Sequence, residues 1–293
     1  MRVALIDGHE PKLGDLDSLI DGHFFQATRA MTTMLALGPM LVDFDRHMER
    51  LAAHAEELGI KEVPKPNLMR FEIDSLLARL TGSDQARVRI ILFSAHDGST
   101  RRIIEASALI REQSNAEGLS SGLRLSTVVD KAWPRGSHIK TGVLGKRGIL
   151  IERACSAGFD DVLWVNSDGE ISESTWANIF LIGRTGDLVE VATPPPASGI
   201  LLGVTRQRIM ELLTISKIPV TERVITLDEL PRFDEGFVTS SIRGIRPLVQ
   251  IDRHKLQSVR PNAVVNHIAR LYRTWLKIGS SNDFIGLGQK PHS

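Results

Sequence analysis

Three short segments of the chain carry residues that could perform chemistry on a small molecule. Lys140 precedes a predicted helix, Glu173 follows a polar hairpin turn, and Gly203-Val204-Thr205 leads into another predicted helix. A lysine amine that has lost its proton can attack a carbonyl carbon, and the free backbone N–H groups at a helix start can bind a phosphate. Each segment also has an ordinary interpretation: a solvated surface lysine, an exposed glutamate and a threonine that caps its own helix.

The segments before Lys140 predict a mixture of helices and strands. Residues 44–59 and 68–80 place apolar side chains at helical spacing, so each predicts an amphipathic helix. Residues 86–94 and 101–110 form apolar runs joined by a turn-rich stretch, which is typical of two paired strands. The first part of the chain is therefore predicted to be a small α/β domain.

A polar stretch separates this part from the rest. Residues 112–122 are rich in Ser, Asn and Gly, a composition expected of an exposed linker. We predict an interdomain linker at residues 116–122, a small domain at residues 1–115 and a larger domain at residues 123–293. The larger domain is predicted to contain a helix within residues 144–158, a hairpin that turns at Ser167-Asp168-Gly169, further strands, a helix beginning near Thr205 and a closing helix with Pro261 at its start.

Composition and charge argue against several classes of protein. The chain has 36 basic and 35 acidic residues, so its net charge of +1 provides no single-sign field for nucleic acid or an anionic membrane. The one cysteine, Cys155, cannot form an intramolecular disulfide, and no Cys/His cluster has zinc-ligand spacing, so no metal is expected. No apolar run reaches about 18 residues, and the N-terminus does not resemble a signal peptide. We expect a cytoplasmic protein whose partners are small molecules or copies of itself.

The stretch from Lys140 to Ile182 resembles the signature of class IV aminotransferases. Its order is lysine, helix, the turn GFDD, a strand, an Asp-Gly turn, then Glu173 and ANIFLI. Upstream, FQATRA and DFDRHMERL resemble the family's Phe-Glu-Thr-x-Arg segment and its His-x-x-Arg-Leu helix; downstream, SGILLGVTRQRIMELL resembles its Gly-Ile-x-x-Gly-Ile/Val-Thr-Arg segment. The resemblance covers nearly the whole chain. It implies an α+β, two-domain enzyme of fold type IV, like D-amino-acid aminotransferase, with a small N-terminal α/β domain, a larger β-rich C-terminal domain with helices, and pyridoxal 5'-phosphate as cofactor.

The resemblance gives Lys140 and Glu173 the central roles. Lys140 is expected to hold the cofactor as a Schiff base and to act as acid and base. Glu173 is expected to face the pyridine nitrogen and keep it protonated, which strengthens the ring as an electron sink. Lys146 is the obvious rival for the Schiff base, but it lies too close to the Asp-Gly hairpin for the family pattern.

The resemblance also implies a set of phosphate ligands. Arg50 is expected to form charge-assisted hydrogen bonds to the cofactor phosphate, together with the backbone N–H groups of Val204 and Thr205. Ser241 falls where relatives place another phosphate-contacting side chain, and Ser240 is a close competitor. The alternative for Arg50 is a surface ion pair, worth at most about 1 kcal/mol.

Candidate substrate ligands come from the first part of the chain. Arg89 occupies a strand position where some relatives hold a substrate carboxylate, although an arginine on a strand is more often structural. Phe25 and Arg29 of the FQATRA segment are two further candidates for contacting substrate.

Some positions depart from the family pattern. Relatives commonly carry Asn-Tyr soon after the lysine, where this chain has Val143 and Leu144, and the family's Glu-Thr pair is replaced by Gln26-Ala27. The single tyrosine, Tyr272, lies on the last predicted helix. The pocket tyrosines of branched-chain and D-amino-acid aminotransferases therefore have no counterpart.

Three functions follow as hypotheses. The leading one is amino transfer between an amino acid and a 2-keto acid. The second is 4-amino-4-deoxychorismate lyase activity, which yields 4-aminobenzoate and pyruvate, because SSIRGIRPL resembles the lyase version of this segment. The third is a non-catalytic relative that retains the fold. Members of the family are usually homodimers or larger homo-oligomers, so the resemblance implies self-association.

Overall fold

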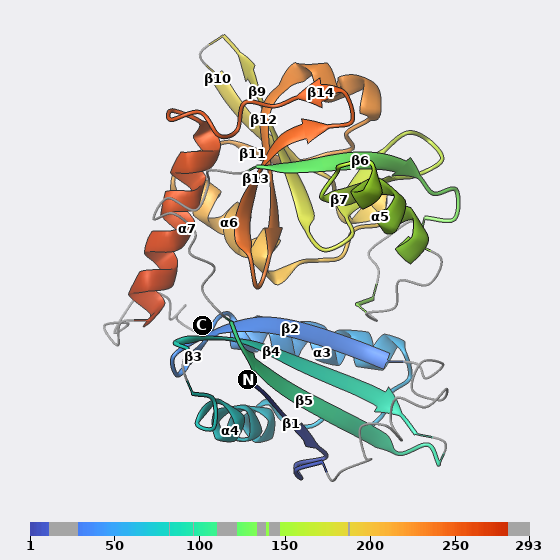
Figure 1. The fold of residues 1–293 in the computed structure, drawn as a ribbon, viewed down its shortest axis with the longest axis vertical. Coiled ribbons are helices and arrows are strands. Elements are labelled where there is room, and N and C mark those ends of the chain that lie inside the picture. Colours follow the sequence, from blue (N-terminus) through green and yellow to red (C-terminus); the bar gives the residue numbers. More distant parts are fainter. Residues whose placement is uncertain are drawn as a thin grey trace, which may run out of the picture.

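Two β-sheets organise the chain, and they lie one above the other in the view of Figure 1. The computed structural model describes residues 1–11, 29–81, 83–95, 97–109, 122–133, 139–140, 147–186 and 188–280. The N-terminal sheet is built from strands within residues 2–108, and the C-terminal sheet from strands within residues 123–255. Residues 110–121 lie outside the described part, so the domain limits and the linker at residues 116–122 stay predictions.

The N-terminal sheet is antiparallel and has five strands in the order β1-β5-β4-β2-β3. The predicted pair of strands is present as β4 and β5. Arg89 of β4 lies opposite Thr33 on one side and Glu105 on the other. The strands are β1 (Arg2–Ile6), β2 (Arg29–Leu37), β3 (Met40–Leu41), β4 (Gln85–Ser94) and β5 (Thr100–Ala108).

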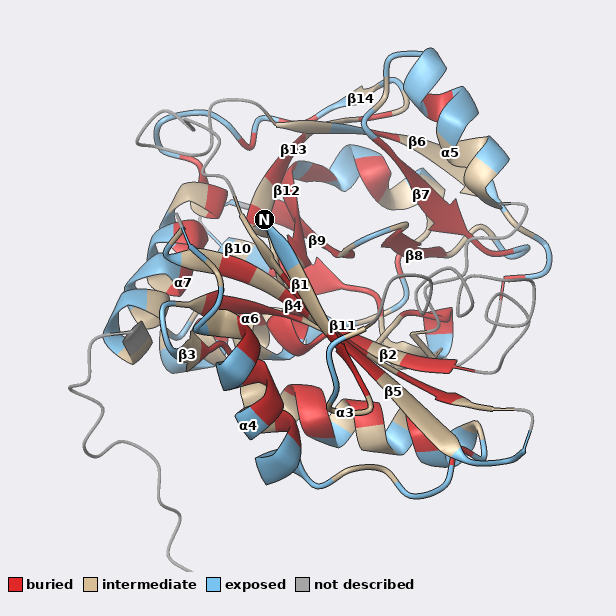
Figure 2. Cartoon of the chain, turned by 60° about the horizontal axis from the view of Figure 1, so that its bottom comes forward, coloured by how far each residue is buried: buried red, intermediate tan, exposed pale blue. Residues whose placement is uncertain are grey.

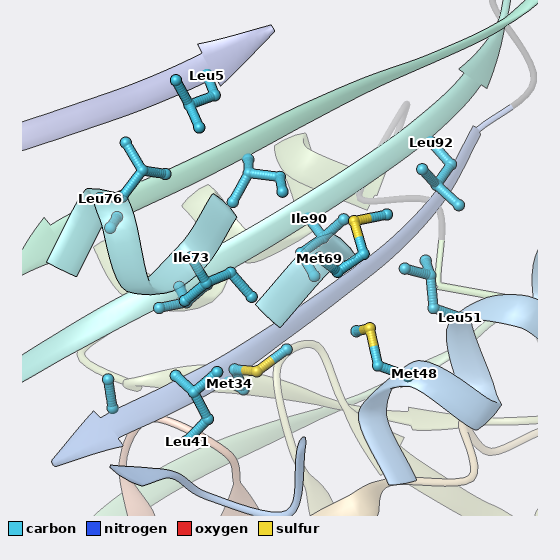
Figure 3. Packing of buried hydrophobic residues seen from close by; sticks show 14 of the residues in the cluster. Leu5, Met34, Leu41, Met48, Leu51, Met69, Ile73, Leu76, Ile90 and Leu92 are labelled. Carbon is cyan, nitrogen blue, oxygen red and sulfur yellow. The ribbon is translucent and has the colours of Figure 1, made fainter. Parts of the chain in front are cut away.

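Helices α3 (Phe44–Glu57) and α4 (Pro66–Leu77) cover one face of this sheet. Successive side chains of a strand point to opposite faces, so the even-numbered residues of β2 and β4 pack against these helices. Figure 3 shows the resulting core, in which Met34 and Ile90 of the sheet meet Met48 and Met69 of the helices. Both helices agree with their predicted bounds to within three residues.

The C-terminal sheet has nine strands and curls around its core (Figure 1). Its order is β11-β10-β9-β12-β13-β6-β7-β8, and β14 pairs with β13. Helices α6 and α7 pack against β9 and β12 through a cluster that includes Phe180, Ile209, Phe237 and Ile268. The elements are β6 (Leu123–Val129), α5 (Arg147–Ser156), β7 (Asp161–Val165), β8 (Ile171–Ser174), β9 (Asn178–Thr185), β10 (Leu188–Thr193), α6 (Val204–Ile215), β11 (Val220–Glu222), β12 (Phe233–Ser240), β13 (Gly244–Ile251), β14 (His254–Lys255) and α7 (Val264–Ser280), with short 3-10 turns at η1 (Pro196–Ser198) and η2 (Leu227–Arg232).

Most predicted elements of the C-terminal part are present, with small shifts at helix starts. Helix α6 begins at Val204, one residue before the predicted start. Helix α7 begins at Val264 rather than at Pro261, since the buried carboxylate of Glu235 accepts a hydrogen bond from the N–H of Val265 at 3.1 Å. Strands β1 and β2 were not predicted. The fold is α+β, as expected from the resemblance.

The burial of side chains shows which face of each helix packs against its sheet. Figure 2 shows helices α3 and α4 buried along one side and exposed along the other, as amphipathic helices on a sheet must be. Among the described helices none is long and apolar enough to cross a membrane.

Candidate active site

Lys140 lies beside the N-terminal sheet although it follows that sheet by many residues. Its carbonyl oxygen accepts a hydrogen bond from the backbone N–H of Met31, at the edge of β2, at 2.9 Å. Its own N–H donates to Nδ1 of His54 in α3 at 3.4 Å. The backbone of Lys140 is therefore held by a strand and a helix of the N-terminal part.

The surroundings of the Lys140 amine favour the loss of its proton. Burial and the charge of Arg50 lower the pKa of Lys140 to about 8; Glu173 opposes this shift and Arg89 adds to it. These interactions bring four residues predicted for the site into one neighbourhood. An amine with this pKa is neutral in about one molecule in ten at pH 7, far more than for an ordinary lysine, and the neutral form is the one that attacks a carbonyl.

Glu173 is buried at the end of the β7–β8 hairpin, with 6% of its surface exposed. The exposed alternative for this residue is therefore wrong. Its Oε2 accepts a hydrogen bond from Nδ2 of Asn178 at 2.6 Å and another from the N–H of Leu201 at 3.1 Å. The same Asn178 amide donates to the carbonyl of Leu201 at 2.9 Å. These bonds fix the direction of the carboxylate and tie it to the segment that leads into α6.

The start of α6 has the features of a phosphate cradle. Gly203 is the residue before the first turn, and no side chain caps the helix, so the capping alternative for Thr205 is wrong. Instead, Oγ1 of Thr205 lies 3.5 Å from Oγ of Ser241. This contact favours Ser241 over Ser240, whose Oγ accepts a hydrogen bond from the N–H of Arg243 at 3.4 Å.

Tyr272, the single tyrosine of the chain, reaches the same place from α7. It is buried, and its hydroxyl is hydrogen-bonded to Thr205. Burial, followed by the charge of Asp43, raises the pKa of Tyr272, so the hydroxyl keeps its proton. Tyr272 therefore contacts the phosphate cradle through the side chain of Thr205.

Arg50 extends from α3 toward the start of α6. Its Nη1 donates to the carbonyl of Leu202 at 3.2 Å and its Nη2 to Oγ1 of Thr32 at 3.1 Å. Its Nε is buried and has no hydrogen-bond partner among the described residues. Burial lowers the pKa of Arg50 to about 10, against an opposing effect of Glu173, so the guanidinium remains charged at neutral pH. The surface ion-pair alternative is wrong.

These residues fit pyridoxal phosphate. An uncapped helix start, two hydroxyls and a charged arginine with an unused buried donor match a phosphate, which accepts many hydrogen bonds. Gly203 is also required for the cradle, because a Cβ there would overlap the amide oxygen of Asn178. Lys140 and Glu173 could then serve the aldehyde and the ring nitrogen of the same molecule.

The candidate substrate ligands are Arg89, Arg29 and Phe25. Arg89 points to the face of the N-terminal sheet opposite α3 and α4, and its Nε is buried without a partner in the described part. It has no ion pair there, whereas its neighbour Arg87 pairs with Glu105 at 3.2 Å. Arg29 is buried at the start of β2. Phe25 lies outside the described residues.

Four residues that matter to the geometry were given no role from the sequence. Asn178 and Leu201 hold Glu173, while Thr32 and His47 lie behind Arg50. Asn178 and His47 belong to the quoted motifs, so their spacing from Glu173 and Arg50 was a usable signal. Thr32 had no such signal, because its role depends on a long-range contact. Leu201 lies in the SGILLGVTRQRIMELL segment, but it acts through its backbone N–H, which its residue type does not reveal. Among the described residues no group of His, Cys, Asp and Glu could hold a metal ion.

The chain is similar in sequence to a known protein family and to curated proteins. A model of the family described as amino-transferase class IV matches residues 29–251. A probable branched-chain-amino-acid aminotransferase from Thermotoga maritima is 32% identical over 122 residues, which are 42% of this chain and 43% of that protein. The match therefore spans less than half the length of this curated relative.

Solved structures share the fold over nearly the whole chain. A branched-chain aminotransferase from Thermoproteus uzoniensis, crystallised with norvaline, is 21% identical, covers 95% of this chain and 96% of its own, and gives a TM-score of 0.77. A putative 4-amino-4-deoxychorismate lyase from Legionella pneumophila is 22% identical, covers 90% and 95%, and gives a TM-score of 0.73. At these identities the likeness shows the fold alone.

Proposed function

Since the chain belongs to the class IV aminotransferase family, whose cofactor is pyridoxal 5'-phosphate, we propose that it moves an amino group between an amino acid and a 2-keto acid. One observation carries the proposal: the Lys140 amine, with its pKa lowered to about 8, shares a site with Glu173, Arg50 and the uncapped start of α6. The proposal includes the roles of these site residues.

Each residue has a task that its geometry supports. Arg50, the N–H groups of Val204 and Thr205, and the Ser241 hydroxyl bind the phosphate. Glu173 holds a proton on the ring nitrogen. When bound, pyridoxal phosphate supplies the aldehyde for attachment and the electron sink for a substrate carbanion. The Lys140 amine forms the covalent attachment and, once the substrate amine displaces it, carries the proton from the substrate Cα.

The substrate end is assigned to Arg89. A half-buried arginine with an unused donor and no ion pair in the described part of the chain is suited to a carboxylate. Burial lowers the pKa of Arg89, and a bound carboxylate would restore the favourable environment that burial removes. Arg29 and Phe25 remain further candidates. We also propose a homodimer, as the family resemblance implies, and sedimentation analysis would test it.

The first experiment asks whether Lys140 carries the cofactor and whether amino acids react. The protein purified with pyridoxal phosphate is reduced with borohydride, and peptide mass spectrometry locates the adduct; we expect it on Lys140. The unreduced protein is then screened with amino acids for conversion of the cofactor to its amine form. Conversion by no amino acid contradicts amino transfer, and a colourless protein that borohydride leaves unchanged supports the non-catalytic alternative.

Replacing Glu173 tests the proposed ring contact. Glu173→Gln should still bind pyridoxal phosphate but should convert amino acids at least about 10-fold more slowly, because a neutral amide does not stabilise a protonated ring nitrogen as a carboxylate does. Single-turnover absorbance measurements give the rate. Glu152→Gln, an exposed glutamate on α5, is the matched charge control and should react at the wild-type rate. Equal rates for both variants would remove Glu173 from the mechanism.

The lyase is the second candidate function. The SSIRGIRPL segment forms the turn between β12 and β13 and brings Ser241 beside Thr205. A neighbour of the same fold carries the lyase name, which supports the alternative only through the fold. A lyase releases pyruvate from 4-amino-4-deoxychorismate without converting the cofactor to its amine form. Pyruvate release with an unchanged cofactor spectrum would therefore favour the lyase over the transaminase.

A further inference from the structure

A buried hydrogen-bonded chain lies behind Arg50. Thr32 of β2 and His47 of α3 have 0% and 1% of their surfaces exposed. Oγ1 of Thr32 is 2.8 Å from Nδ1 of His47 and 3.1 Å from Nη2 of Arg50. The hydroxyl therefore connects an imidazole to the guanidinium at the proposed phosphate site.

The donors and acceptors of this chain can be assigned from its chemistry. A guanidinium can only donate, so Oγ1 of Thr32 accepts from Arg50. The Thr32 hydroxyl proton is then satisfied if it is donated to Nδ1 of His47, since these two are the hydroxyl's only partners among the described residues. His47 must accept at Nδ1 and is thus neutral, with its proton on Nε2.

The electrostatics of His47 agree with this assignment. Burial lowers the pKa of His47 well below its ordinary value, and the charges of Arg50 and Lys140 lower it further. A protonated imidazole would lose the acceptor at Nδ1 and repel both cations. The neutral ring is therefore the form that the surroundings favour.

Two acceptors from different parts of the fold fix the guanidinium. Thr32 belongs to the N-terminal sheet, while the Leu202 carbonyl lies just before α6, and Arg50 donates to both. Because the guanidinium is planar, two such contacts leave it little freedom to rotate. Its buried Nε, without a partner in the described part, shows that donor capacity remains.

We propose that Thr32 and His47 are positioning residues, which orient the Arg50 guanidinium so that its remaining N–H groups face a phosphate at the start of α6. The inference rests on the proposed function, because that phosphate belongs to the cofactor. Loss of the Thr32 hydroxyl leaves Nη2 of Arg50 without its acceptor, so the guanidinium turns away from its phosphate-binding orientation.

The test compares a ligand that has the phosphate with one that lacks it. Thr32→Val keeps the shape and the β-branching of the side chain but removes the hydroxyl. In the apoprotein it should weaken binding of pyridoxal phosphate about 10-fold, the effect expected for one hydrogen bond to a charged group. Binding of pyridoxal should stay within about twofold of wild type, and Thr32→Ser should restore phosphate-dependent binding. Both affinities are measured by absorbance titration.

A double-mutant cycle asks whether the effect passes through Arg50. In an Arg50→Met background, Thr32→Val should cause no further loss of affinity for pyridoxal phosphate. His47→Phe keeps a ring and removes the acceptor, and it should reproduce the selective loss if Thr32→Val fails to fold.

Four outcomes separate the inference from the proposed function. Equal losses for pyridoxal phosphate and pyridoxal would indicate a merely structural role and overturn the inference. Unchanged affinity in Thr32→Val, or a full loss in the Arg50→Met background, would do the same. In each of these cases a wild-type protein that binds the cofactor leaves the proposed function standing. A wild-type protein that does not bind pyridoxal phosphate overturns both.

Discussion

At the residue scale, the charge state of the Lys140 amine sets what the site can do. Its pKa is lowered to about 8, so the amine is protonated below about pH 8 and neutral above it. The rate at which the apoprotein attaches pyridoxal phosphate should therefore rise with pH up to about 8 and then level off. An ordinary lysine would keep gaining reactivity up to about pH 10.4. Stopped-flow absorbance across this range measures the midpoint.

The same experiment tests the role of Arg89. Its charge is one cause of the lowered pKa of Lys140, so Arg89→Gln should move the midpoint of the pH profile upward. Arg153→Gln, an exposed change on α5, should leave the midpoint where it is. A midpoint that does not move in Arg89→Gln would mean that this arginine is too well screened to influence the amine.

At the scale of elements, the site depends on how the start of α6 meets β9. A Cβ at Gly203 would overlap the Oδ1 of Asn178, the residue that holds Glu173. Gly203→Ala should therefore displace Asn178, lower the free energy of unfolding by about 1–3 kcal/mol and weaken cofactor binding. Gly148→Ala on α5 meets no atom within 4 Å and should stabilise the protein slightly, by about 0.5–1 kcal/mol. Denaturant titration measures the free energy of unfolding of both variants. Equal stability of Gly203→Ala and Gly148→Ala would contradict the close contact between Gly203 and Asn178.

Ion pairs join the N-terminal end of α3 to the middle of α6. Asp43, just before α3, pairs with Arg208 of α6, and Arg46 pairs with Glu211 at 2.8 Å. Because the Asp43 side chain is only 6% exposed and its backbone has a φ of 52°, a conformation that asparagine tolerates, Asp43→Asn removes the charge with little backbone strain.

We expect Asp43→Asn to lower the free energy of unfolding by about 1–3 kcal/mol. It should also weaken binding of pyridoxal phosphate, since α3 carries Arg50 and α6 carries the helix start. Asp74→Asn breaks the exposed pair with Arg70 and should cost less than about 1 kcal/mol. If the two variants lose the same stability, the buried α3–α6 ion pair contributes no more to folding than an exposed pair does. Calorimetry and cofactor titration supply both quantities.

At the scale of the whole molecule, hydrogen bonds at the proposed cofactor site join the N-terminal part of the chain to the C-terminal part. Lys140 is bonded to β2 and α3, and Arg50 of α3 reaches the segment before α6. A cofactor attached to Lys140 and held by Arg50 would therefore stabilise both sheets together. When the free concentration of pyridoxal phosphate is 100 times its dissociation constant, binding should add about 2.7 kcal/mol to the free energy of unfolding.

Hydrogen exchange can locate this stabilisation. The amide of Met31 donates to Lys140, so peptides covering β2 should gain protection when pyridoxal phosphate binds, together with peptides at the start of α6. Peptides from the outer helix α4 serve as the control and should change less. Protection confined to the C-terminal sheet would show that the cofactor does not couple the two parts.

The sequence alone predicted the family, the candidate site residues and much of the local structure. Lys140, Glu173, Arg50 and the segment around Thr205 were recognisable because residue types and their order survive in the primary sequence. Helices α3 and α4 and strands β4 and β5 were predicted because their apolar spacing matches a single period. Motif order and apolar spacing depend on residues that are near one another in the sequence, so they can be recognised without knowing the tertiary structure.

The tertiary structure decided which surfaces meet. The segment of β2, RAMTTMLAL, mixes helix-favouring Ala, Met and Leu with β-branched Thr, so only its pairing with β4 from Arg29 to Leu37 makes it a strand. The burial of Glu173 and the contact of Thr32 with Arg50 likewise depend on long-range packing. Hydrogen bonds and pKa shifts arise from what surrounds a group in space, and residues distant in sequence supply those surroundings at this site.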